Sequence, residues 1–418
     1  MDKYRVPNRM NLLRAREYGL ENSFVHIEQT RRIADFTLCK YRSLTPFHHS
    51  SISTMCLEQS ECRYLLSGDA SGHICCHDMF PSSLVATHPI IFQIDRNSNR
   101  DHHTHKICSL IWYPNDNGLF ITLGLDKKLK IWDTNRVKMA DEYEFANFAY
   151  SAHMAQTRNT SLIAVAHENG DLRLIDIRTG SNSHIIHSHS GKGICLVKWF
   201  NNNPNLLASG GADGRVLFTD IRSSRTYYMV LDPDNVLTDH PQMRSRATTA
   251  STSSVAHTRG IKSLEFLPDN SHLLTLGADS HMYLWDVNSG QRLLVNYGRI
   301  PTDNVRIKTL ACTQMKHDRT KSLVYVPCGK SICAYDILSG ERLTTLSGHL
   351  VPASTCIYNS LSIELYSCSD DILVWAAIKK QQENYELSMK TQERRPETTR
   401  SLAQILNRDQ WSDDEDEV

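Results

Sequence analysis

The sequence predicts an all-β protein, a seven-bladed β-propeller, on three observations. Apolar, strand-like segments end on the same kind of dipeptide, which is Trp-Asp in the best examples. Its second residue falls at seven places: Asp78, Asp133, Asp176, Asp220, Asp286, Asp336 and Ala376. The successive spacings are 55, 43, 44, 66, 50 and 40 residues, and four of the six lie near the roughly 40 to 50 residues of one four-stranded blade.

The third observation is the common order of elements ahead of each dipeptide. Alternating apolar runs such as 107–114 and 261–268 predict a first strand, and a second apolar run and a tight turn follow. Asp126, Asp213 and Asp279 each stand six residues before the first member of the dipeptide. Histidines precede the first strand at His105, His189, His257 and His349. This pattern resembles the WD40 repeat family over about residues 45 to 377.

The resemblance implies a buried hydrogen-bond network in each blade, formed by the histidine, a strand hydroxyl, the turn aspartate and the tryptophan. Satisfied buried polar groups make a blade rigid. The members of a catalytic triad, by contrast, meet once, in one accessible site. Here the histidine, the hydroxyl and the aspartate recur at similar offsets in several repeats. We therefore interpret the trio as structural. The implied members are His105, Asp126, Trp132, His189, Asp213, His257, Asp279, Trp285 and His349.

Three repeats depart from the family pattern. Thr219 and Ile175 stand where the tryptophan is expected, and Gly329 stands at the place of the turn aspartate. We expect these blades to be held by packing alone.

The segments outside the repeats predict three regions. Residues 1–40 read as a helix-loop-helix, since two short amphipathic stretches flank Gly19. That segment either packs on its own propeller or serves as a docking segment for a partner's groove, because each helix is too short to be stable alone. Residues 41–377 form the propeller, and polar residues 378–418, with an acidic end, predict a disordered tail.

Composition limits the classes of function. Lys plus Arg and Asp plus Glu both total 46, so no overall charge attracts nucleic acid or membrane. Twelve cysteines occur without a C-x-x-C pair, and the histidines of residues 101–105 lack acidic or thiol partners at ligand spacing, so neither a metal nor a cofactor is expected. No phosphate-binding loop, nucleophile elbow or metal motif appears, and we expect a protein that is not an enzyme.

A closer resemblance rests on longer stretches. Residues 111–135, 293–300 and 12–21, supported by 324–341 and the closing WSDDEDEV, are similar to the Cockayne syndrome A family. The resemblance implies the substrate-recognition subunit of a cullin-4 RING E3 ubiquitin ligase in transcription-coupled nucleotide excision repair, in the nucleus. The implied partners are the large subunit of the damaged-DNA-binding complex as adaptor, cullin 4 and its RING protein, the Cockayne syndrome B ATPase and stalled RNA polymerase II.

The same resemblance implies which residues bind the adaptor. In the N-terminal segment they are Leu12, Leu13, Arg16 and Leu20. Arg178 and Arg222 match the arginine of a Trp-Asp-x-Arg box whose tryptophan is absent from both repeats. The alternative is a WD40 scaffold of another class, histone-binding or G-protein-β-like, without ligase function. Direct DNA contact through loop lysines such as Lys127 and Lys128 is not expected to dominate.

Overall fold

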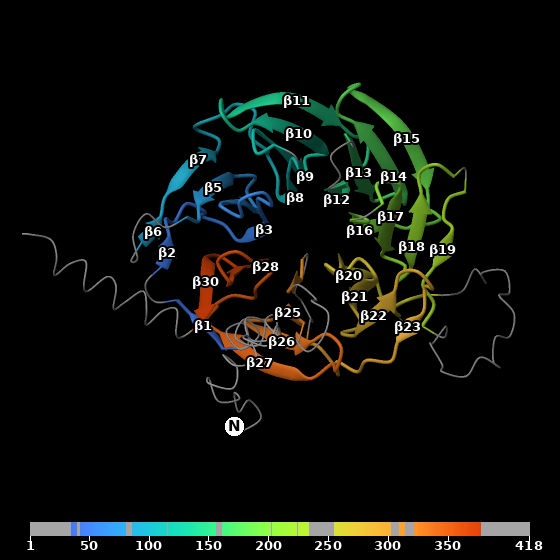
Figure 1. The fold of residues 1–418 in the computed structure, drawn as a ribbon. Helices are drawn as coiled ribbons and strands as arrows, with labels where there is room; N and C mark the ends of the chain where they lie inside the picture. Colours follow the sequence, from blue (N-terminus) through green and yellow to red (C-terminus); the bar gives the residue numbers. More distant parts are fainter. Residues whose placement is uncertain are drawn as a thin grey trace, which may run out of the picture.

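The computed structural model shows a ring of seven β-sheets around a central axis (Figure 1). It describes residues 35–39, 42–80, 86–114, 116–155, 161–201, 203–223, 225–233, 255–301, 309–313 and 322–377. Every regular element in these ranges is a strand, and seven sheets have four strands each. The predicted seven-bladed propeller is confirmed. The predicted helix-loop-helix (apart from residues 35–39) and the tail lie outside the described residues.

Blades one to four follow the chain from the innermost to the outermost strand. Blade one is β3 (Ile52–Leu57), β4 (Tyr64–Asp69), β5 (Ile74–Asp78) and β7 (Ile90–Ile94). Blade two is β8 (Ile107–Trp112), β9 (Leu119–Gly124), β10 (Lys128–Asp133) and β11 (Lys138–Glu144). Blade three is β12 (Ala149–Met154), β13 (Leu162–His167), β14 (Asp171–Asp176) and β15 (Ser181–His187). Blade four is β16 (Ile194–Trp199), β17 (Leu206–Gly211), β18 (Val216–Asp220) and β19 (Met229–Val230).

Blades five to seven complete the ring. Blade five is β20 (Ile261–Phe266), β21 (His272–Gly277), β22 (Met282–Asp286) and β23 (Arg292–Leu293). Blade six is β24 (Ala311–Cys312), β25 (Leu323–Cys328), β26 (Ser331–Asp336) and β27 (Arg342–Ser347). Blade seven is β28 (Thr355–Asn359), β29 (Glu364–Cys368), β30 (Ile372–Ala377) and β1 (Phe36–Leu38). Outside the ring, β2 (Arg42–Leu44) pairs in parallel with β6 (Ala86–His88).

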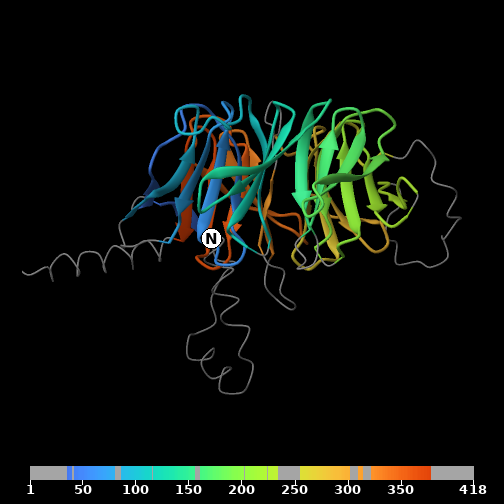
Figure 2. The ribbon, with the colours of Figure 1, turned by 90° about the horizontal axis from the view of Figure 1, so that it is seen from above.

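The core lies between neighbouring blades, which stand face to face around the ring (Figure 2). Leu66 of blade one, for example, packs in one apolar cluster with Phe120 and Trp132 of blade two. Middle strands are therefore buried on both faces and read as continuous apolar runs, as in β9 and β21. The outermost strands face solvent on one side, and β11 accordingly alternates exposed and half-buried residues.

The ring is closed by the beginning of the chain. Strand β1 is the outermost strand of blade seven, with Phe36 opposite Ala377 and Leu38 opposite Trp375. A buried ion pair between Arg42 and Glu364 holds the following segment on the same blade. The predicted division at residue 40 falls after this strand, so the propeller already begins at Phe36. Three residues without apolar alternation gave no signal for a strand whose partner lies more than 330 residues away.

The aspartate of the Trp-Asp dipeptide ends its strand by binding the next turn. In six blades its Oδ atom accepts the backbone N–H two residues later, at 2.9–3.3 Å. This Asx turn directs the chain back into the outermost strand. Blade seven has Ala376 instead, and its outermost strand is β1, from the beginning of the chain. The exceptional alanine thus marks the place where the ring is closed.

Candidate functional site

Blade five contains a complete chain of hydrogen bonds. Trp285 donates its indole N–H to Thr275 Oγ1 at 2.9 Å, and His257 Nε2 lies 2.9 Å from that hydroxyl. His257 Nδ1 lies 3.1 Å from Asp279 Oδ1. Since Nδ1 must donate to the carboxylate, Nε2 accepts the proton of Thr275. Every polar side-chain atom of the chain therefore has a partner.

The carboxylate of Asp279 is also bound by the backbone. The N–H groups of Thr258 and His281 donate to it at 3.1 and 3.2 Å. Burial alone would raise the pKa of this carboxyl, but the hydrogen bonds outweigh burial and lower the pKa to about 2. Asp279 is therefore ionised at neutral pH and joins the loop before the first strand to the turn between β21 and β22.

Blade two has the same chain, but with a different histidine from the one expected. His103, which is fully buried, lies 2.8 Å from Asp126 Oδ2 and 2.7 Å from Thr122 Oγ1, and Trp132 donates to Thr122 at 2.9 Å. Burial lowers the pKa of His103, which agrees with a neutral ring. The predicted His105 is exposed and binds Thr104 instead, so its assignment to this network was wrong. His103 stands four residues before β8, as His257 stands four residues before β20, whereas His105 stands only two residues before β8.

The other blades carry shorter versions. In blade four His189 binds Ser209 at 3.0 Å and Asp213 at 3.2 Å, but Thr219 replaces the tryptophan donor and binds the carbonyl of Thr226. In blade seven His349 binds Ser367 at 2.7 Å, which also accepts the indole N–H of Trp375, and Ser369 takes the aspartate's place.

Sequence reasoning missed the network of blade one. His48 lies 2.8 Å from Ser67 Oγ and 3.3 Å from Asp69. A signal was available in the spacing between histidine and strand hydroxyl, which is 19, 19, 20, 18 and 18 residues in blades one, two, four, five and seven. That spacing admits His48 and His103 and excludes His105, which stands 17 residues before Thr122. Blades three and six have the buried Val165 and Val326 at the hydroxyl position, where no histidine network can form. For blade four the expectation of packing alone was wrong, because His189, Ser209 and Asp213 are hydrogen-bonded there.

These networks are built for stability. The rings of His257 and His103 and the hydroxyls they bind are almost without solvent exposure. Adjacent blades also meet here: a side chain on Gly214 would come within 2.1 Å of the His257 carbonyl oxygen, and one on Gly72 within 2.1 Å of the His103 carbonyl oxygen. The blade histidines therefore join the loop before each first strand to the second strand of the same blade.

The predicted adaptor-binding arginines lie at the ends of β14 and β18. Arg178 is 82% exposed, and its nearest carboxylate is Asp176 at 4.0 Å. Arg222 is 64% exposed but forks onto Asp220 of its own turn, with Nε–Oδ1 at 3.1 Å and Nη2–Oδ2 at 2.8 Å. This contact lowers the pKa of the Asp220 carboxyl. Both guanidinium groups reach solvent on one face of the ring, here termed the strand-end face, on which the seven third strands end.

The first described residue, Asp35, lies on the strand-end face. Phe36 pairs with Ala377 at the end of β30, so residue 35 lies at the same rim as Asp176 and Asp220. Leu12, Leu13, Arg16 and Leu20 lie outside the described residues. Blades three and four stand across the ring from blade seven (Figure 1), so one partner can touch both arginines and Asp35 only by covering much of the face.

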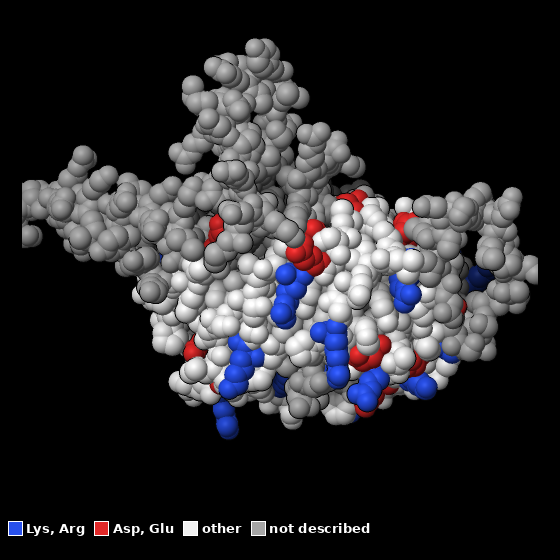
Figure 3. Space-filling model, turned by 90° about the horizontal axis from the view of Figure 1, so that it is seen from below, with Lys and Arg blue, Asp and Glu red and all other residues white. Residues whose placement is uncertain are grey.

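The outer side of the ring carries no concentrated charge in the view of Figure 3, where basic and acidic side chains are scattered singly among neutral ones. Lys127 lies over the ring of Phe148 at 4.8 Å and binds the Ala146 carbonyl, and Lys128 pairs with Glu142 at 2.5 Å. These contacts engage the two lysines considered for DNA binding within blade two and its loop.

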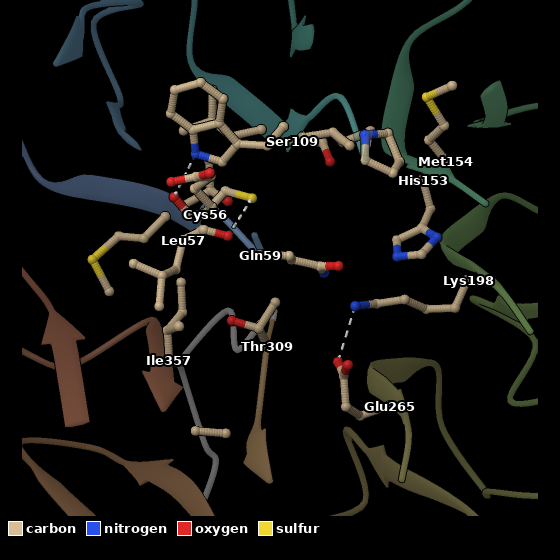
Figure 4. Close-up of a pocket in the computed structure, with 18 of the residues that line it drawn as sticks. Cys56, Leu57, Gln59, Ser109, His153, Met154, Lys198, Glu265, Thr309 and Ile357 are labelled. Carbon is tan, nitrogen blue, oxygen red and sulfur yellow. Dashed lines mark hydrogen bonds and ion pairs between the residues drawn. The ribbon is translucent and has the colours of Figure 1, made fainter. Parts of the chain in front are cut away.

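The innermost strands enclose a central cavity of about 550 Å³. Lys198 of β16 and Glu265 of β20 form an ion pair at 3.0 Å inside it, next to His153 of β12 (Figure 4). Among the described residues no three His, Cys, Asp or Glu side chains are placed to hold a metal ion. In the same part of the chain no helix is long and apolar enough to cross a membrane.

Comparisons with known proteins agree with this architecture. The family model described as "WD domain, G-beta repeat" matches residues 96–133, 180–220 and 250–286. The chain is 29% identical to the WD repeat-containing protein ATCSA-1 of Arabidopsis thaliana, over 85% of this chain and 92% of that protein. It is 28% identical to Radiation-sensitive protein 28 of Saccharomyces cerevisiae, over 46% of this chain and 40% of that protein. The chain is therefore a seven-bladed β-propeller with WD40 repeats, and the family model matches three of them.

Proposed function

We propose that this protein is the substrate-recognition subunit of a cullin-4 RING E3 ubiquitin ligase that acts in the nucleus, in transcription-coupled nucleotide excision repair. The similarity to ATCSA-1 over nearly the whole chain and to Radiation-sensitive protein 28 over half of it supports a repair-related receptor. In this proposal the chain is a non-catalytic receptor, since its histidines and aspartates are used inside the blades.

One observation carries the docking part of the proposal. Asp35, Arg178 and Arg222 all lie on the strand-end face. In the proposal the large subunit of the damaged-DNA-binding complex binds this face and links it to cullin 4 and its RING protein. The opposite face, formed by the loops that the blade networks hold, is then left for the Cockayne syndrome B ATPase and stalled RNA polymerase II.

The two arginines contribute differently to such docking. Arg178 presents its guanidinium without a close carboxylate, and a planar fork of donors suits a partner's carboxylate or carbonyl oxygens. Arg222 must share its fork with Asp220 or exchange that contact for one with the partner. We therefore expect Arg178 to be the stronger of the two contacts.

The test measures binding of the purified full-length chain to the purified adaptor subunit. Arg178→Ala and deletion of residues 1–35 should each weaken binding by about tenfold or more, while Arg222→Ala weakens it less. The matched control is Arg136→Ala, an arginine of the blade two strand-end turn whose side chain is 80% exposed. Melting temperatures should stay unchanged for all three substitutions.

Two results would contradict the proposal. Full binding by a protein that lacks residues 1–35 and carries Arg178→Ala would show that the strand-end face is not the adaptor site. Capture of histones or G-protein subunits in place of the adaptor would favour the alternative, a WD40 scaffold of another class.

A further inference from the structure

The central cavity contains a close pair of opposite charges. Lys198 Nζ lies 3.0 Å from Glu265 Oε2, and the side chains are only 17% and 24% exposed. Among the described residues that line the cavity, the other carboxylate is Glu58, which is buried and accepts a hydrogen bond from Ser60. The neighbouring lining includes neutral side chains such as Thr309, Ile357 and Cys56, and burial raises the pKa of the Cys56 thiol, so it stays uncharged. The described lining therefore presents Lys198 and Glu265 side by side as a cation and an anion.

A directed donor stands beside this pair. His153 Nδ1 accepts the backbone N–H of Trp199 at 3.1 Å, and burial lowers the pKa of the ring well below its usual range. The imidazole is neutral, and its proton is on Nε2. Figure 4 shows His153, Lys198 and Gln59 pointing into the same space from three different blades. Two donors, Lys198 and His153, thus lie on one side of that space, and the acceptor Glu265 lies below Lys198.

The charges restrict the ligand class. A singly charged ligand would have to take one member of the pair and leave the other buried without a partner, which is costly. A zwitterion can replace one ion pair by two and leave no charge unmatched. In an α-amino acid the ammonium nitrogen and the carboxylate carbon are about 2.5 Å apart, close to the 3.0 Å between Lys198 Nζ and Glu265 Oε2. The cavity of about 550 Å³ has ample room for such a molecule.

We propose that the central channel binds a free α-amino acid with an apolar side chain. Its carboxylate accepts from Lys198 and the Nε2–H of His153, and its ammonium group donates to Glu265. Its side chain lies along Ile357, Thr309 and Cys56, which line the same cavity. The site is independent of the strand-end face, since it is formed by the innermost strands of several blades.

The experiment uses the full-length chain and titration calorimetry with the L-α-amino acids one at a time. For each binder, the amine without the carboxylate and the acid without the ammonium group are titrated as well. Binding of at least one apolar amino acid is expected at or below about 1 mM. Each of its two singly charged analogues should bind at least about tenfold more weakly, because each leaves one member of the pair unmatched.

Variants then locate the site. Lys198→Met and Glu265→Gln should each reduce the affinity by about tenfold or more. Lys128→Met, which breaks an ion pair of similar chemistry between β10 and β11, should leave it unchanged. The proposal is overturned if no amino acid binds at about 10 mM, if a singly charged analogue binds as well as the zwitterion, or if Lys128→Met has the same effect as Lys198→Met. The first two outcomes need only the unaltered protein.

Discussion

Replacing His103 or His105 by phenylalanine should show which of these two histidines belongs to the buried network of blade two. His103→Phe keeps a ring of similar size in the buried site but removes both of its hydrogen bonds, to Asp126 at 2.8 Å and to Thr122 at 2.7 Å. His105→Phe changes a residue of the same loop that is exposed. The sequence pattern pointed to His105, and the structure points to His103, so the pair of variants decides between them.

The magnitude follows from the bonds that are lost. A hydrogen bond to a carboxylate contributes about 1.5–3 kcal/mol and a neutral one about 1 kcal/mol, so His103→Phe should cost about 2–4 kcal/mol. For a propeller of roughly 340 residues this lowers the melting temperature by about 3–6 °C. His105→Phe should stay within about 0.5 kcal/mol. Differential scanning fluorimetry measures both, and equal shifts, or a larger one for His105→Phe, would refute the assignment.

Three further outcomes follow from the same geometry. Asp279→Ala should cost about 1–3 kcal/mol in urea unfolding, because its buried donors lose their acceptor; an unchanged midpoint would count against this. Burial lowers the pKa of His349 to about 4, so the unfolded chain binds more protons than the folded one between about pH 6.5 and 4. The free energy of unfolding should therefore fall as the pH is lowered from about 6.5 to 4, and His349→Gln should reduce this dependence. Gly214→Ala, with φ +78° and a carbonyl 2.1 Å from the new Cβ, should cost about 2–4 kcal/mol, whereas Gly191→Ala, with φ +80° and open space, should cost about 1–2 kcal/mol; equal losses would contradict the contact between blades.

The repeats could be predicted because each blade carries the same local signals. The ends of the third strands at Asp78, Asp133, Asp176, Asp220, Asp286 and Asp336 agree with the structure residue by residue, since alternation and the turn aspartate are both short-range features. The number of blades followed directly from these six and Ala376. Pairings between distant parts of the chain, such as that of β1 with β30, leave no such short-range signal in the sequence.

Two differences show what the sequence pattern leaves open. The closing strand β1 pairs with β30 across almost the whole chain, and only a pairing register reveals it. In residues 101–105, three histidines compete for one place, and proximity to the first strand favours His105. What decides is reach, because the ring must extend from the loop to Thr122 in the second strand. The spacing of 18–20 residues found in the other networks excludes His105, at 17 residues, and admits His102 and His103, of which His103 is the buried one. The number of residues between the histidine and the strand hydroxyl is therefore a better guide than the distance of the histidine from the first strand.

The departures from the repeat have the same physical basis as the repeat itself. Ala376 stands in place of the turn aspartate in the blade whose outermost strand comes from residues 36–38. Val165 and Val326 replace the hydroxyl in the two blades without a histidine network, and each is fully buried, where an unpaired hydroxyl would be costly. Each exception removes a polar group whose partner is missing. In this propeller the histidine is thus kept where a strand hydroxyl can pair with it, as in blade seven, where Ser369 takes the place of the aspartate.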